Sequence, residues 1–200
     1  KKTKAWYSRF ARRWCDRKFG VGADGVLVAE ATGKNGLRMR ILNADGSEAE
    51  MCGNGARCFA LWAKETTFET LAGTILAEIG AVKNGAGQVA VRLSDPFGLR
   101  LGVPINVLGK DIHVHFINTG VPHAVVFVAE IDGIDVKTIG HAIRFHKEFA
   151  PAGTNVNFVE YAGKDAIRIR TYERGVEDET LACGTGTCAS AIVSALMADD

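Results

Sequence analysis

The sequence has no long hydrophobic run and no excess of charge of either sign. No apolar stretch approaches the roughly 20 residues that a membrane-spanning helix needs, and none has the form of a signal peptide. The 24 Lys and Arg residues nearly balance the 23 Asp and Glu residues, so charge gives no reason to expect a nucleic acid or a membrane as partner. Prolines are few, 4 against 23 glycines, which is typical of a folded chain with many tight turns.

A disulfide framework is not indicated either. The five cysteines are an odd number, and no export signal accompanies them, which favours reduced thiols in the cytoplasm. Hydrophobic residues make up 47% of the chain, enough for a buried core. The length of 200 residues suits two domains of about 100 residues. We therefore expect a cytoplasmic globular protein.

One pattern occurs twice. Cys52–Gly55 (CGNG) and Cys183–Gly186 (CGTG) each close a polar loop and open an apolar helical stretch. The two cysteines are 131 positions apart, whereas the strand-like runs 37–41 and 167–171 are offset by 130, so one residue is inserted before the second cysteine. The repeat indicates two similar halves, each of which carries one thiol.

This repeat predicts an α+β fold of two pseudo-symmetric domains, 1–94 and 95–200, with the boundary at the Pro/Gly turn 94–98. Long crossover helices are missing, so each domain should be a mixed, mostly antiparallel, barrel-like sheet around a central helix. The apolar periodicity predicts helices at 3–18, 55–64, 135–145 and 184–197. It predicts strands at 26–29, 37–42, 74–79, 88–93, 111–117, 123–129, 155–160 and 166–172. Helix 184–197 has so little polar surface that we expect it to be enclosed on most sides.

The position of the two cysteines points to acid–base chemistry. A cysteine just before a helix meets free backbone N–H groups and the positive end of the helix dipole, which favour thiolate over thiol. The same amides can bind a carboxylate. If the two turns face each other, an amino acid could be held by its α-carboxylate with Cys52 and Cys183 on opposite faces of the α-carbon. One thiolate would remove the α-proton and the other thiol would return one. The alternative, two buried helix caps, is disfavoured by the repetition.

The other thiols and histidines predict less. Cys58 and Cys188 point away from Cys52 and Cys183 around their helices, so a four-thiolate zinc site has poor geometry. Cys15 is expected to be a core or surface thiol. His113 and His115 share one face of a strand, but two ligands without a third favour an exposed histidine pair. We predict no metal site.

Six segments together resemble the diaminopimelate epimerases, a family of amino-acid epimerases that use no cofactor. They are Asp16–Gly25 (DRKFGVGADG), Asn43–Glu48 (NADGSE), Cys52–Cys58 (CGNGARC), Gly153–Asn157 (GTNVN), Tyr172–Gly175 (YERG) and Ala182–Gly186 (ACGTG). The related proline racemases normally have His at the position of Asn54, which argues against that subfamily. At Val121 many members of the family have an Asn that contacts the distal end of the substrate.

The resemblance implies a function for each segment. Cys52 and Cys183 would be the acid–base pair that interconverts LL- and meso-diaminopimelate, in the supply of lysine and peptidoglycan precursors, without pyridoxal phosphate or any other cofactor. Substrate-binding roles are implied for two groups of residues. Those at the reacting centre are Gly53, Asn54, Gly184 and Thr185. Those at the distal amino-acid end are Asn43, Asn155, Glu173 and Arg174, while His123 matches a family histidine near the site.

Two further alternatives stay open at this point. The substrate could be another amino acid, or the chain could be an inactive, redox-responsive homologue whose thiols close into a disulfide. The second is favoured by the absence of the strand that usually opens family members and of the strands that follow the second cysteine helix. The expected partner is a small diamino-dicarboxylate, with no nucleic acid and no membrane. The resemblance also suggests a homodimer.

Overall fold

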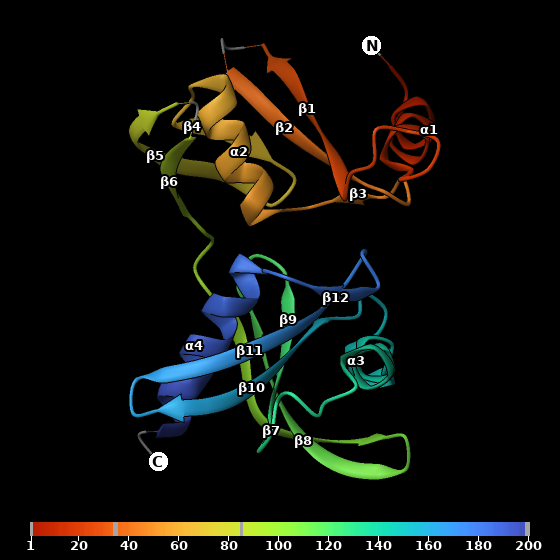
Figure 1. Cartoon of the computed structure of the whole chain (residues 1–200), viewed down its shortest axis with the longest axis vertical. Coiled ribbons are helices and arrows are strands. Elements are labelled where there is room, and N and C mark those ends of the chain that lie inside the picture. Colours follow the sequence, from red (N-terminus) through yellow and green to blue (C-terminus); the bar gives the residue numbers. More distant parts are fainter. Residues whose placement is uncertain (1, 34–35, 85, 199–200) are drawn as a thin grey trace. The chain divides into compact units, whose positions relative to one another are not determined.

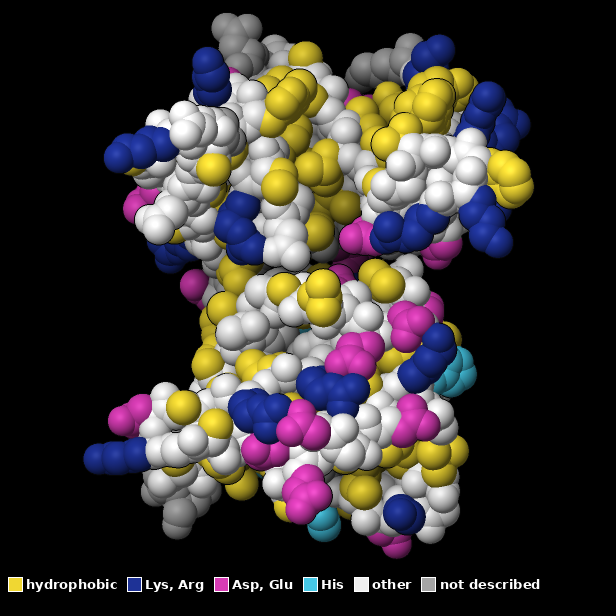
Figure 2. All heavy atoms as spheres, viewed as in Figure 1, with side chains coloured by type: hydrophobic (Ala, Val, Ile, Leu, Met, Phe, Trp, Pro, Cys, Tyr) yellow, Lys and Arg dark blue, Asp and Glu magenta, His cyan; other side chains and the backbone are white. Residues whose placement is uncertain are grey.

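The structure, a computed structural model, describes residues 2–33, 36–84 and 86–198. The chain divides into two compact units, Lys1–Ser94 and Asp95–Asp200. Among the described residues, no helix has both the length and the apolar character needed to cross a membrane. On the face shown in Figure 2, basic and acidic side chains are interspersed. Ion pairs between described residues include Arg168 with Asp132 at 2.5 Å and Arg170 with Glu179 at 2.7 Å.

The described part of the first unit has two helices and a six-stranded mixed sheet (Figure 1). The helices are α1 (Lys4–Cys15) and α2 (Gly53–Ala63). The strands are β1 (Gly25–Thr32), β2 (Gly36–Asn43), β3 (Glu48–Ala49), β4 (Thr67–Thr70), β5 (Gly73–Lys83) and β6 (Ala86–Arg92). The sheet order is β1-β2-β4-β5-β6, with β3 paired to β2, and only the β2–β4 pairing is parallel among those described.

The second unit is built from the same kinds of elements. Its helices are α3 (Val136–Arg144), the short 3₁₀ helix η1 (Lys147–Phe149) and α4 (Gly184–Ala198). Its strands are β7 (Phe97–Val107), β8 (Lys110–Asn118), β9 (Pro122–Phe127), β10 (Asn155–Gly163), β11 (Ala166–Glu173) and β12 (Asp178–Thr180). The sheet order is β12-β11-β10-β9-β8-β7. The β9–β10 pairing is parallel and the other described pairings are antiparallel.

The strand register confirms the internal repeat. Val26 faces Leu42 between β1 and β2, and the residues 130 positions later, Val156 and Tyr172, face each other between β10 and β11. On the next strand, Leu42 faces Glu48, whereas Tyr172 faces Glu179, which is an offset of 131. The inserted residue therefore lies in the turn between β11 and β12. The repeat covers strand, strand, short strand and helix. The three remaining strands join it beside β2 in the first unit and beside β10 in the second.

Each sheet curves around one helix, as the α+β prediction required. Helix α2 contacts β2, β5 and β6, although these strands are not all neighbours in the sheet. Helix α4 contacts the four strands β8 to β11. The prediction that this helix is enclosed on most sides was wrong. One face is buried through Ala189 and Val193, but Cys188, Ala191 and Ala195 on the opposite face are exposed.

Candidate active site

Cys52 lies at the N-terminus of α2, where the predicted chemistry requires it. Its backbone is extended, and its sulfur accepts a hydrogen bond from the backbone N–H of Gly55 at 3.3 Å. A Cβ atom on Gly55 would lie 3.0 Å from Leu27 Cδ2 and 3.4 Å from the cysteine sulfur. Glycine at this position therefore lets the first turn of the helix pack closely against β1 and the thiol. The half-buried sulfur receives a donor from the free end of the helix.

Two further predicted residues of the first unit lie in the turns around this helix. Asn54 is exposed in the first turn of α2, and its side-chain oxygen accepts a hydrogen bond from the Arg57 guanidinium. Asn43 ends β2, and its side-chain amide donates to Ser47 Oγ at 3.0 Å. Asn43 thus helps to close the turn that leads through β3 to Cys52.

The sheet of the second unit gathers three predicted residues at one end. Asn155 begins β10 and is paired in register with His123 on the parallel strand β9. Glu173 ends β11, which runs antiparallel to β10. The starts of two parallel strands and the end of their antiparallel neighbour lie at the same end of a sheet. Strand β12 pairs with this end of β11, and the chain then continues to Cys183.

The side chain of Asn155 connects these segments. It is 4% exposed, donates to the Pro122 carbonyl at 2.9 Å and accepts from the backbone N–H of Arg174 at 2.9 Å. The Arg174 guanidinium donates to the Ala152 carbonyl at 3.3 Å. Glu173 accepts a hydrogen bond from the Thr180 hydroxyl at 2.8 Å. Asn155 therefore fixes the turn that carries both charged residues.

Cys183 immediately precedes α4, and its carbonyl accepts the Thr187 N–H at 2.9 Å. Its sulfur lies 3.5 Å from the hydroxyl of Thr185. That hydroxyl lies 2.9 Å from Nε2 of His123, which is fully buried. Burial, and after it the positive charge of Arg174, lowers the pKa of His123 to about 3. The imidazole is therefore neutral at physiological pH, and a polar chain leads from it to the thiol.

One contact of this region carried no sequence signal. The hydroxyl of Thr119, a residue 2% exposed, donates to the Thr185 carbonyl at 2.9 Å. It holds the first turn of α4 against the loop between β8 and β9. A threonine in an Asn-Thr-Gly turn is common, so its burial could not be foreseen.

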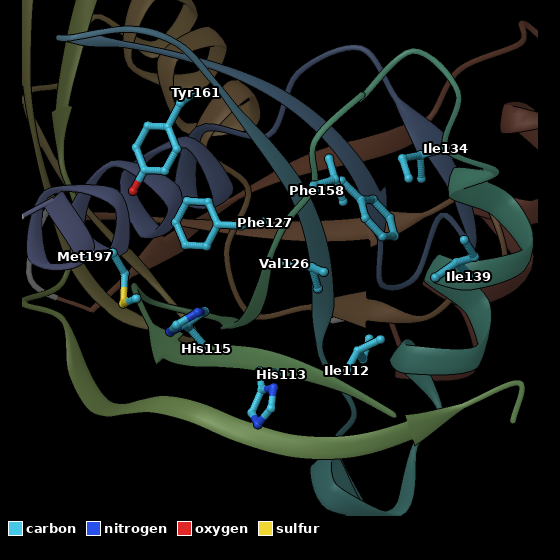
Figure 3. A pocket seen from close by; sticks show the side chains of 11 residues that line it. Ile112, His113, His115, Val126, Phe127, Ile134, Ile139, Phe158, Tyr161 and Met197 are labelled. Carbon is cyan, nitrogen blue, oxygen red and sulfur yellow. The ribbon is translucent and has the colours of Figure 1, made fainter. Parts of the chain in front are cut away.

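The remaining thiols and histidines lie apart from these contacts. Cys58 and Cys188 are exposed and Cys15 is buried. The prediction that His113 and His115 form an exposed pair was wrong for His115, which is 6% exposed and packs edge-on against Phe127 at 5.4 Å. Both histidines line a cavity of about 590 Å³ in the second unit (Figure 3). Its other lining residues include Phe127, Tyr161 and Met197, and the predicted site residues are not among them.

No group of three or more His, Cys, Asp or Glu side chains suited to a metal ion occurs in the described part of the chain. The arrangement instead offers two thiols, each at the beginning of a helix in its own unit. Each has a hydrogen-bonding group of the first helical turn close to its sulfur: a backbone N–H for Cys52 and a hydroxyl for Cys183.

Comparison with known proteins identifies the family. The family model described as "Diaminopimelate epimerase" matches residues 1–94 and 115–199. The chain belongs to this family. A diaminopimelate epimerase of Aquifex aeolicus is 48% identical over 196 residues, covering 94% of this chain and 69% of the relative. That of Hydrogenobaculum sp. is 46% identical over 201 residues, covering 95% and 71%.

Solved structures of more distant proteins share the fold of the family. A probable proline racemase from Agrobacterium radiobacter matches with a TM-score of 0.68 and 21% identity, covering 94% of this chain and 64% of that protein. A PhzF-family protein of Bacillus anthracis matches with a TM-score of 0.64 and 18% identity, covering 93% and 68%. Together with the two six-stranded mixed sheets, these matches confirm the predicted fold class.

Proposed function

We propose that this chain is a diaminopimelate epimerase in which Cys52 and Cys183 exchange the α-proton of the substrate. The reaction, an isomerisation, interconverts LL- and meso-diaminopimelate and belongs to lysine biosynthesis. The observation that carries the proposal is the matched placement of the two thiols. Each lies at the start of the helix that ends a strand–strand–strand–helix repeat, in a chain 48% identical to a named diaminopimelate epimerase.

The mechanism follows from what a thiol at a helix N-terminus can do. One cysteine, as thiolate, removes the α-proton from one face, and the other, as thiol, delivers a proton to the opposite face. The electrons left on the α-carbon need stabilisation, which the backbone N–H groups of the first helical turns supply by holding the α-carboxylate. Gly53, Asn54, Gly184 and Thr185 provide these turns. No pyridine cofactor is needed in this scheme.

The distal, non-reacting amino-acid end of the substrate is expected to bind to the polar residues near the turns. Arg174 can grip a carboxylate with two parallel hydrogen bonds, and Glu173 can accept from an ammonium. Asn43 adds a directional contact from the first unit. For Asn155 we propose an indirect part, because both ends of its amide already bind the Pro122 carbonyl and the Arg174 N–H. We also propose a cytoplasmic location, and the homodimer stays a prediction.

The test is α-proton exchange in heavy water, measured by mass spectrometry of the recovered substrate. LL-diaminopimelate is offered under reductant to the unaltered chain, to Cys52→Ala and to Cys183→Ala. Each substitution should reduce turnover by at least ~100-fold, the lower range for a lost general acid or base. Cys58→Ala and Cys188→Ala, which remove exposed thiols, are the matched controls and should retain turnover. Wild-type turnover in both active-site variants would refute the two-thiol mechanism. Exchange of the α-proton of glutamate or proline, without exchange in diaminopimelate, would refute the substrate assignment.

A further inference from the structure

A chain of buried polar side chains ends at the sulfur of Cys183. The Thr171 hydroxyl donates to Asn157 Oδ1 at 3.0 Å, and Asn157 Nδ2 lies 3.0 Å from His123 Nδ1. His123 Nε2 lies 2.9 Å from Thr185 Oγ1, which lies 3.5 Å from the sulfur. The four side chains that lead to the sulfur are between 0% and 6% exposed, namely Thr171, Asn157, His123 and Thr185. Since water does not reach them, the direction of each hydrogen bond is set by its protein partners.

Asn157 determines that direction. Its Nδ2 atom also donates to the Ala124 carbonyl at 3.3 Å. A carbonyl oxygen can only accept, so the NH2 group of the amide, and not its oxygen, is on the side of Ala124 and His123. An NH2 group can only donate, so Nδ1 of His123 must be the unprotonated nitrogen. The neutral ring therefore carries its proton on Nε2.

The proton on Nε2 of His123 determines whether the Thr185 hydroxyl donates or accepts in its hydrogen bond with the ring. The imidazole donates to Thr185 Oγ1, so the hydroxyl accepts this hydrogen bond and does not donate to His123. That proton can be donated to the sulfur of Cys183, and a donated hydrogen bond favours thiolate over thiol. We propose that Asn157 is a positioning residue for the reaction: by holding His123 as the Nε2–H tautomer, it directs the Thr185 hydroxyl toward the Cys183 thiolate. This rests on the proposed function only in naming Cys183 as a reacting group.

The packing of α4 supports this role. A Cβ atom on Gly186 would lie 2.3 Å from Asn157 Oδ1 and 3.3 Å from the Cys183 sulfur. The helix backbone therefore approaches the asparagine closely and keeps it in place. Because the pKa of His123 is about 3, the ring stays neutral over the pH range in which a thiol ionises.

The first experiment reads the tautomer directly, by ¹⁵N NMR of the histidine rings in the intact chain. The His123 signals are assigned from their loss in His123→Gln. The proposal predicts a proton on Nε2 in the unaltered chain and a proton on Nδ1 in Asn157→Asp, because a carboxylate at that place can only accept. A wild-type ring protonated on Nδ1, or a tautomer unchanged in Asn157→Asp, would overturn the proposal. Circular dichroism shows whether the variants are folded. Once the His123 signals are assigned, the tautomer of the wild-type ring is a test that does not depend on Asn157→Asp.

The second experiment measures the reactivity of Cys183 toward iodoacetamide near neutral pH, with each thiol followed by peptide mass spectrometry. Thr185→Val keeps the shape of the side chain and removes the hydroxyl, so alkylation of Cys183 should slow by about tenfold, as expected for a lost hydrogen bond to a charged group. Thr185→Ser is the matched control and should retain the wild-type rate. Equal rates for all three chains would contradict the proposal. Neither experiment uses the substrate, so failure of the epimerase assignment would leave both results unchanged.

Discussion

Replacing Gly186 by Ala tests the close approach between α4 and the buried asparagine. The added Cβ would lie 2.3 Å from Asn157 Oδ1. Side-chain carbons do not occur within 3.0 Å of such an atom, so Asn157 must move by about 0.7 Å. Its bonds to His123 Nδ1 and Thr171 Oγ1 are both 3.0 Å long. A displacement of this size stretches or bends them beyond useful hydrogen-bond geometry.

The expected change in stability follows from these losses. Two weakened buried hydrogen bonds cost about 1 kcal/mol each, and residual overpacking adds ~1 kcal/mol. Alanine recovers about 1 kcal/mol because it is a better helix former than glycine. The free energy of unfolding should therefore fall by about 2 kcal/mol.

Urea unfolding followed by circular dichroism measures this change. The matched control is Gly53→Ala, in the first turn of α2, where the new Cβ would meet the Arg57 guanidinium at an ordinary 3.9 Å. That variant should equal the unaltered chain or exceed it by up to ~1 kcal/mol. If Gly186→Ala proves as stable as Gly53→Ala, the packing argument for Asn157 is refuted.

Two further predictions concern stability. Because the pKa of His123 is about 3 in the folded chain and roughly 6.5 in an unfolded one, the unfolded state takes up more protons below pH ~6.5. The free energy of unfolding should fall as pH drops from ~6.5 toward ~3, by up to about 1.4 kcal/mol per pH unit. Urea unfolding at several pH values measures how steeply the free energy of unfolding falls with pH. The fall should be less steep in His123→Gln than in the unaltered chain, and unchanged in His113→Gln, which alters an exposed ring. Equal pH dependence in the unaltered chain and both variants would contradict the burial argument. Asn155→Leu removes the bonds to the Pro122 carbonyl and the Arg174 N–H, so the free energy of unfolding should fall by about 2–3 kcal/mol. Thermal unfolding measures this loss, and an unchanged midpoint would count against the assignment.

Much of the fold could be predicted from apolar periodicity and from the repeat. All four predicted helices and eight predicted strands are present, most with ends shifted by one to three residues. Strand β7 was missed because Gly98, Gly102 and Pro104 indicate a loop. The structure places β7 at the edge of its sheet, where proline is tolerated. Strands β3 and β12 are too short to show a period, and β4 has four residues, three of them polar.

The position of each cysteine at a helix N-terminus was also predictable, but the contacts of the polar residues around Cys183 were not. A cysteine–glycine turn before an apolar helical stretch indicates a helix N-terminus, so the sequence alone predicted that Cys52 and Cys183 each begin a helix. The bonds of Asn155 and Asn157 depend on which strands are neighbours, and the parallel pairing of β9 with β10 joins segments more than 30 positions apart. Likewise, His115 looked exposed because its burial depends on Phe127 from the adjacent strand.

A crystal structure of this chain bound to diaminopimelate would test the central claim most directly, through the distance from each cysteine sulfur to the substrate α-carbon. The account predicts both sulfurs at roughly 3–3.5 Å from that carbon, the separation of reacting groups, on opposite faces of it. A complex with only one sulfur near the α-carbon, or with the two sulfurs in separate cavities, would contradict it.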